Sequence, residues 1–113
     1  MKSNLEGLGW DKEEFVMWLE LQGLSRRVAR DYMSRCLRVE SFTNESLCIM
    51  TSSSNDFLQL MELIHDYAVT QSDNYKSIKS LKGSLRLAVR KFSIFKYGEV
   101  ALKYPNGYSL VRR

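Results

Sequence analysis

The chain has 113 residues, of which 44% are hydrophobic and 27% are charged, enough for one domain with a single modest core. Six glycines and one proline are too few for a disordered or collagen-like chain. The longest apolar run, Phe15 to Leu19, has five residues, far below the ~18 that a membrane span needs. The opening Met1-Lys2-Ser3-Asn4 does not begin an apolar signal-peptide core. We therefore expect a cytoplasmic protein with no membrane partner.

The residues that commonly carry catalysis or hold metals are scarce. Two cysteines, Cys36 and Cys48, make neither a disulfide framework nor a metal quartet, so we expect reduced thiols. Together with His65 they match no zinc spacing. His65 stands beside Asp66 and Tyr67 in a helical pattern, which indicates a helix-surface residue. We expect no enzymatic activity of this chain alone, no metal and no cofactor.

The net charge of +4 is sorted along the chain. Residues 1–22 have a balance of −3 and residues 23–40 a balance of +3. Residues 41–75 contain five acids and no Lys or Arg, whereas residues 76–113 contain ten basic residues and a single acid, Glu99. Sorted charge of this kind is typical of a protein with one side that faces a polyanion.

The hydrophobic pattern predicts two helices in the first half of the chain. The first covers 11–22, with Asp11 as N-cap, Trp10 and Phe15 as a hydrophobic staple, and Gly23 as the stop. The second begins at the Ser25 cap and ends near residue 41. Its apolar residues recur every three or four positions and predict a core face of Val28, Ala29, Tyr32, Cys36 and Val39.

Two more helices are predicted in the second half. Residues 43–55 are rich in Ser, Thr and Asn and predict a loop, or a loop with one helical turn. A third helix is expected at 56–70, capped by Ser54 or Asn55. The fourth and longest is expected at 75–97, with a core face of Ile78, Leu81, Leu85, Ala88, Val89, Phe92 and Phe95. The fold class is therefore all-α, with four main helices.

The C-terminal end has a different pattern. Val100, Leu102 and Tyr104 alternate, and Pro105-Asn106-Gly107 follows. This pattern predicts either a short hairpin with an Asn-Gly turn or a linker. We divide the chain into a helical domain at 1–98 and a linker, or the start of a missing domain, at 99–113.

Cations stand where the second and fourth helices begin. Arg26 and Arg27 open the second, and Lys76 and Lys79 open the fourth. A cation beside the positive end of a helix dipole is unfavourable by ~0.3–1 kcal/mol. Helix N-termini with free N–H groups and basic side chains form phosphate sites. We therefore expect a nucleic-acid partner.

Duplex DNA fits the residues better than a single strand, because most of the aromatic residues fall on core stripes and a single-strand site needs exposed aromatic rings. An α-helix fits the major groove, where arginine reads guanine. We expect phosphate contacts from Arg26, Arg27, Lys76, Lys79 and Lys82. Base contacts are expected from some of Arg30, Ser34, Arg38, Arg86, Arg90 and Ser93.

Two segments resemble a known family. Gly23-Leu24-Ser25, then Tyr32, Val39 and Phe42, resembles the signature of the N-terminal core-binding domain of tyrosine recombinases (phage integrases). The run Ala88-Val89-Arg90-Lys91-Phe92-Ser93-Ile94-Phe95 resembles the last helix of that domain, and Lys103-Tyr104-Pro105 the passage to the catalytic domain. The resemblance covers residues 11–105, and residues 43–55 have no counterpart in it.

The resemblance implies a SAM-like orthogonal bundle of four helices that clamps one side of duplex DNA at a recombination half-site through its second and fourth helices. It also implies a catalytic domain in cis and other recombinase protomers on the DNA. The family's His-x-x-Arg element is absent, since His65 is followed by Asp66, Tyr67 and Ala68, and nothing supports Tyr108 as the nucleophile. The rival interpretation is a SAM-like interaction module whose basic face binds an acidic protein.

Overall fold

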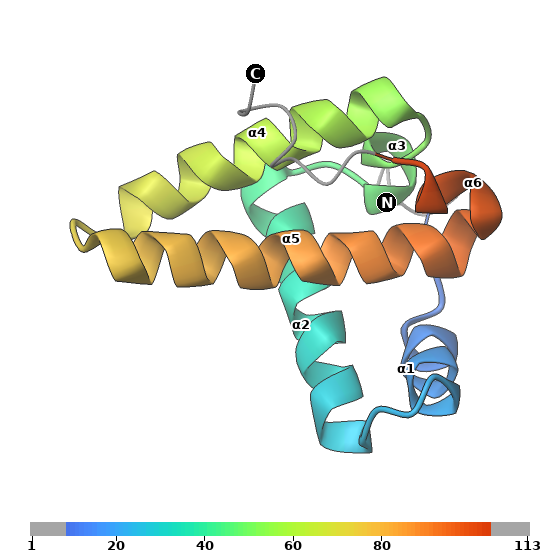
Figure 1. Cartoon of the computed structure of the whole chain (residues 1–113). Helices are drawn as coiled ribbons and strands as arrows, with labels where there is room; N and C mark the ends of the chain where they lie inside the picture. Colours follow the sequence, from blue (N-terminus) through green and yellow to red (C-terminus); the bar gives the residue numbers. More distant parts are fainter. Residues whose placement is uncertain (1–8, 105–113) are drawn as a thin grey trace, which may run out of the picture.

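The computed structural model describes residues 9–104, which form an all-α globule with no strand in that range. Four main helices account for most of it, and two single-turn helices complete it (Figure 1). The main helices are α1 (Lys12–Leu21), α2 (Arg26–Thr43), α4 (Ser54–Gln71) and α5 (Tyr75–Tyr97). The short ones are α3 (Leu47–Met50) and α6 (Glu99–Leu102). The all-α prediction is confirmed.

Polar side chains set where the main helices begin. Asp11, Ser25 and Asn74 accept the N–H groups of Glu14, Val28 and Ser77, which satisfies donors that have no partner inside the helix. The caps Asp11 and Ser25 are the predicted ones, whereas Asn74 was expected only as part of the turn before the fourth helix. The cap of α4 is Ser53 rather than Ser54 or Asn55, because the Ser53 hydroxyl receives the N–H of Asp56.

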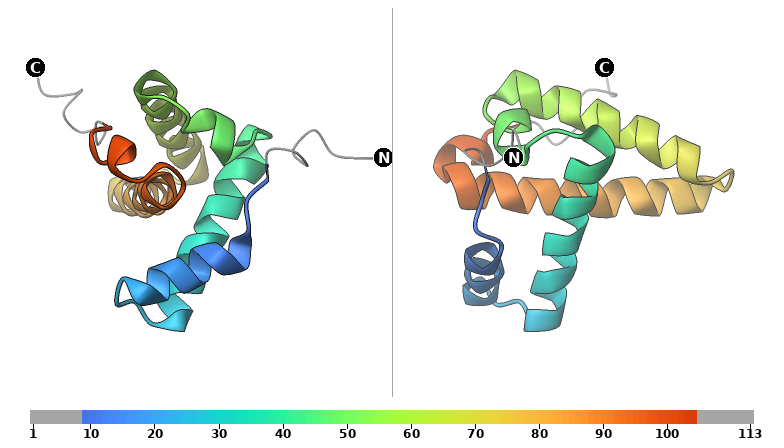
Figure 2. Two further views of the ribbon diagram at one scale, coloured as in Figure 1. Left: turned by 90° about the vertical axis from the view of Figure 1, so that its right-hand side faces the viewer. Right: turned by 180° about the vertical axis from the view of Figure 1, so that it is seen from behind.

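The helices are arranged around the crossing of α2 and α5. In Figure 1, α5 passes in front of α2 at a steep angle, α4 runs back along α5, and α1 lies beside the first half of α2. The view from behind in Figure 2 shows the same arrangement, with α2 now in front of α5. At the crossing the thiol of Cys36 donates to the carbonyl oxygen of Ala88 at 3.4 Å.

The core lies where α1, α2, α4 and α5 meet. Phe15, Phe57 and Phe92 are fully buried, and the rings of Phe15 and Phe92 lie edge to face, 6.0 Å apart. Trp10 and Phe15 form the predicted staple, with ring centroids 5.6 Å apart. One predicted core residue is misplaced: Val28 is 39% exposed, because it points to the side of α2 away from α1.

Two segments for which we predicted alternatives, 43–55 and 99–104, each contain one helical turn. The polar stretch at 43–55 contains the single helical turn α3, whose Leu47, Cys48 and Met50 are buried. The predicted hairpin is wrong in its first half: residues 99–102 form α6, and Ala101 and Tyr104 are buried three residues apart, a helical spacing. Gly98, with φ of +67°, lets the chain change direction before α6. The predicted turn at Pro105-Asn106-Gly107 lies outside the described residues.

Candidate nucleic-acid interface

The predicted arginines of α2 meet different partners. Arg26 pairs with Glu20 of α1 at 2.9 Å, and Arg30 pairs with Glu13 of α1 at 3.2 Å. We expected Arg26 to meet a phosphate, but Glu20 of α1 is its partner in the structure. These two arginines therefore hold α1 against α2, and their charge is partly compensated.

The remaining basic residues of α2 are placed differently. Arg38 donates to the Tyr67 hydroxyl at 2.9 Å and lies over the ring of that tyrosine, so it joins α2 to α4. Ser34 is exposed on the side of α2 turned away from α5. Arg27 is exposed in the first turn, and no carboxylate of the described chain lies within ion-pair distance of it.

The residues of α5 that were expected to contact bases are turned inward. Arg86 donates to the carbonyl oxygen of Met61 at 2.8 Å, and Arg90 donates to that of Tyr104 at 2.7 Å. Ser93 is fully buried and donates to the carbonyl oxygen of Val89. The expectation that Ser93 contacts bases is therefore wrong. Arg86 and Arg90 connect α5 to neighbouring segments, which makes them poor candidates for base contacts.

The N-terminal half of α5 carries accessible charge. Lys76 and Lys79 are exposed, and Lys82 is half-buried with its ammonium 3.2 Å from His65 Nδ1. Burial lowers the pKa of Lys82, and the neighbouring charges of Arg86 and Lys79 lower it further. In the described part of the chain, none of these three lysines forms an ion pair with a carboxylate.

The residues of α2 and of α5 that were expected to contact bases do not share one face of the molecule. Successive residues of an α-helix are turned by about 100°, so side chains two positions from Cys36 or Ala88 point away from the α2–α5 contact. Ser34 and Arg38 therefore project from the side of α2 that α5 does not cover. Arg86 and Arg90 project from the side of α5 that α2 does not cover. Since one helix lies behind the other (Figures 1 and 2), these two stripes face opposite ways.

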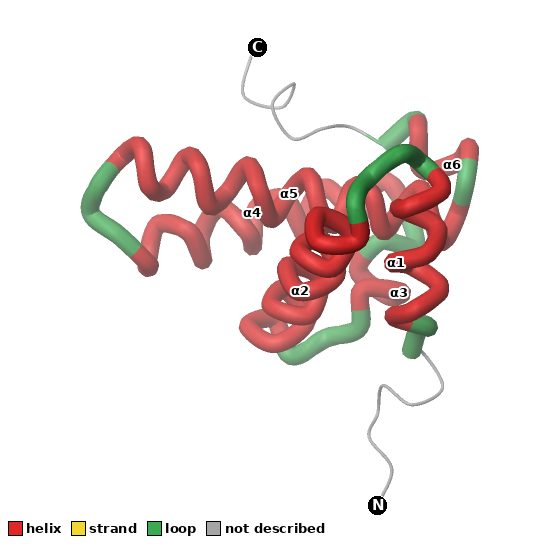
Figure 3. Tube along the Cα trace, turned by 90° about the horizontal axis from the view of Figure 1, so that it is seen from below, coloured by secondary structure: helices red, strands yellow, loops and turns green. Residues whose placement is uncertain are grey.

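The N-terminal halves of α2 and α5 do share a region. From their crossing, α2 extends downward and α5 extends to the left in Figure 1, and no other described helix lies in the quarter between them. Figure 3, seen from below, shows α1 on one side of α2 and the α4–α5 hairpin extending on the other. We call the surfaces of α2 and α5 that border this quarter the N-terminal corner.

Helical geometry identifies the side chains of the N-terminal corner. On α2, Val28 and Arg35 lie about 160° and 140° around the helix from Arg30, which faces α1. On α5, Ser77, Ser80 and Ser84 lie about 140–160° from Lys82, which faces α4. Asp31 lies about 100° from Arg30 and Lys76 about 120° from Lys82. The corner therefore consists of Val28, Asp31, Arg35, Lys76, Ser77, Ser80 and Ser84. Arg27 stands next to it in the first turn of α2, on the same side of the helix as Ser34 and Arg38.

Most side chains of the N-terminal corner were not among the predicted site residues. Val28 was assigned to the core, and Arg35, Ser77, Ser80 and Ser84 were not expected to contact DNA. For α5, the sequence does contain a signal of this surface: Ser77, Ser80 and Ser84 recur at intervals of three and four residues, which places them on one side of the helix. Small side chains leave room for a duplex backbone to come close to the helix, and hydroxyl groups bind phosphate oxygens.

Residues 9–104 were also searched for a metal site and for a membrane span. That range has no group of three His, Cys, Asp or Glu side chains placed to hold a metal ion. It also has no helix that is long and apolar enough to cross a membrane. Cys36 and Cys48 are both buried as free thiols. Comparisons with protein families, with curated proteins and with solved structures found no match to this chain.

Proposed function

We propose that this chain is a non-catalytic domain that binds duplex DNA through the N-terminal corner. The observation that carries the proposal is that the two long helices that border the open quarter, α2 and α5, each have an exposed cation in the first turn, Arg27 and Lys76. Neither cation forms an ion pair with a carboxylate in the described chain. A phosphate from outside the molecule would offset the unfavourable interaction between each cation and the positive end of its helix dipole.

The helix N-termini add backbone donors to these cations. The Ser25 cap accepts the N–H of Val28, and the Asn74 cap accepts that of Ser77. The N–H groups that precede these capped ones have no acceptor inside the helix and point out of its end, where phosphate oxygens bind well. Lys76 and Arg27 strengthen such sites by charge, and the exposed Ser77 and Ser80 of α5 would supply further hydrogen bonds.

The resemblance to the core-binding domain of tyrosine recombinases supports the same interpretation. α2 and α5 are the second and fourth of the main helices, which are the two that meet DNA in that family. We extend the proposal accordingly to a SAM-like bundle that holds one side of a recombination half-site in the cytoplasm. A catalytic domain in cis and further protomers on the DNA would complete the enzyme.

The test is fluorescence anisotropy of a labelled duplex across a salt series. Arg27→Glu with Lys76→Glu should reduce duplex affinity by tenfold or more and flatten the salt dependence by about two units of log–log slope. Lys96→Glu with Lys103→Glu is the matched control, since both lysines are exposed and lie at the other end of α5 and beyond it. Circular dichroism should report the same helix content for all proteins.

The outcome separates the proposal from its rival. Equal loss of affinity in the two double variants would show that only net charge matters and would overturn the N-terminal corner as the site. No duplex binding by the folded wild type, even at low salt, would overturn the proposal itself. It would favour the alternative, a module whose basic face binds an acidic protein.

A further inference from the structure

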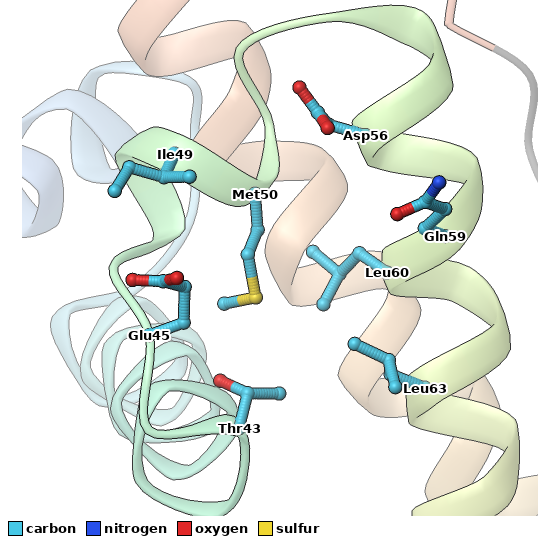
Figure 4. Close-up of a pocket in the computed structure, with 8 residues that line it drawn as sticks. All are labelled: Thr43, Glu45, Ile49, Met50, Asp56, Gln59, Leu60 and Leu63. Atoms are coloured by element: carbon cyan, nitrogen blue, oxygen red, sulfur yellow. The ribbon is translucent and has the colours of Figure 1, made fainter.

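A groove lies between α3 and the first half of α4, on the opposite side of the molecule from the N-terminal corner. It has a volume of about 330 Å³. Figure 4 shows the side chains of Met50 and Leu60 pointing into it from the two helices. Both are buried and form an apolar floor, whereas Ile49 and Leu63 at the rim are 40% and 46% exposed. The groove therefore offers an accessible apolar surface.

Two carboxylates border this apolar surface. Glu45 Oε1 accepts the N–H of Ser46 at 3.2 Å, and Asp56 Oδ2 accepts the hydroxyls of Ser52 and Ser53 at 3.0 and 2.9 Å. These hydrogen bonds hold both carboxylates in place without neutralising them. Figure 4 shows the two acidic groups at opposite sides of the groove.

The stretch of chain that forms the groove supplies no basic residue to balance these two carboxylates. Residues 41–75 contain five acids and no Lys or Arg. In residues 9–104, neither Glu45 nor Asp56 forms an ion pair with a basic residue. An acidic rim repels the phosphates of a nucleic acid, so DNA binding does not explain this surface.

The wall formed by α3 is firmly placed. Its N-cap Ser46 accepts the N–H of Cys48, and Glu40 Oε2 accepts the N–H of Leu47 at 2.9 Å. Leu47 is fully buried beneath it. A single helical turn held from below in this way presents Ile49 and Met50 in a fixed position, and a preformed surface loses less entropy on binding.

We propose that the α3–α4 groove binds a short amphipathic helix of another protein, with aliphatic side chains at i, i+3 and i+7 and Lys or Arg between them. The aliphatic side chains would cover Met50, Leu60 and Leu63, and the cations would meet Glu45 and Asp56. Charge complementarity selects such a segment over an acidic one. The volume is at the small end of ligand pockets, which suits two or three anchoring side chains. This proposal stands apart from DNA binding.

The test is an NMR titration of the full, isotope-labelled chain with two synthetic peptides. Both carry leucines at the i, i+3 and i+7 spacing of a groove-binding helix; one has arginines between them and the other has glutamates. The arginine peptide should shift the resonances of Met50, Gln59 and Leu63, and the glutamate peptide should shift none of them.

Two variants of α4 make the test specific. Leu63 and Val69 are both 46% exposed on the same helix, but only Leu63 lines the groove. Leu63→Lys should weaken the arginine peptide about tenfold, whereas Val69→Lys, which adds the same charge, should leave its affinity near that of the wild type. No shift in the groove, equal binding of both peptides, or equal loss in both variants would overturn the proposal.

Discussion

The indole N–H of Trp10 donates to Glu40 Oε2 at 3.0 Å. The same oxygen accepts the backbone N–H of Leu47 at 2.9 Å. One carboxylate near the end of α2 therefore connects the segment that leads into α1 with the first turn of α3. Trp10 is only 8% exposed, and its ring packs edge to face against Phe92 of α5.

Removal of this carboxylate should destabilise the protein. Glu40→Ala leaves the Trp10 and Leu47 donors without their acceptor, and an unsatisfied buried polar group costs about 1–3 kcal/mol. Glu40→Gln keeps an acceptor oxygen and should lose less. Urea unfolding followed by tryptophan fluorescence measures both, and a Glu40→Ala protein as stable as the wild type would contradict this account.

The aromatic core around Phe92 should be the largest single source of stability. Phe92 is fully buried, and its ring lies 5.0 Å from that of Trp10 and 6.0 Å from that of Phe15. Phe92→Ala should lower the free energy of unfolding by about 3–5 kcal/mol. Leu87→Ala, on the exposed side of the same helix, should change it by less than about 0.5 kcal/mol. Thermal and urea unfolding compare the two, and similar losses would refute this assignment of the core.

The protein should lose stability in alkali. Burial raises the pKa of Tyr97 and of Tyr104, whose hydroxyls donate to the carbonyl oxygens of Cys48 and Thr51. The folded state therefore keeps these protons to a higher pH than the unfolded state, in which tyrosine titrates near pH 10. Their contribution is fully present below about pH 10 and declines as the pH rises further.

Urea unfolding at a series of pH values measures this decline. Tyr97→Phe with Tyr104→Phe should make the fall above pH 10 shallower. Tyr75→Phe is the control, because Tyr75 is 74% exposed. If the double variant declines as steeply as the wild type, the two tyrosines are not the cause.

The two thiols should be unreactive in the folded protein. Burial and, to a lesser degree, the negative charge of Glu40 raise the pKa of Cys36, whose thiol donates to Ala88. Cys48 is also buried. A thiol reagent such as iodoacetamide should modify both only as the protein unfolds, since the thiolate is the reactive form. Mass spectrometry across a urea series checks this, and modification of Cys36 before unfolding would contradict the burial.

Helix caps and core spacing made most of the fold predictable from sequence. The predicted caps Asp11 and Ser25 are short-range signals, since each side chain bonds an N–H three residues ahead. The alternation of Val100, Leu102 and Tyr104 misled because it covers only three positions. Tertiary burial of Ala101 and Tyr104 favours a helical turn there instead.

The site was less predictable, because side-chain partners come from distant segments. The acids that pair with Arg26 and Arg30 lie on α1, and the carbonyl oxygens that engage Arg86 and Arg90 belong to residues far away along the chain. A helical wheel orders residues around one helix. It contains no information on which side faces a neighbour, so it placed Ser93 on a binding stripe although Ser93 is buried.

The most direct test of the proposed DNA surface is amide chemical-shift mapping of the labelled chain with a short duplex at low salt. The N-terminal corner predicts that the largest shifts fall on residues 26–31 and 75–80, where backbone N–H groups at the helix ends approach phosphates. Shifts concentrated on Ser34, Arg38 and Ser41, or on the outer face of α4, would contradict it. So would a duplex that leaves the spectrum of the folded protein unchanged.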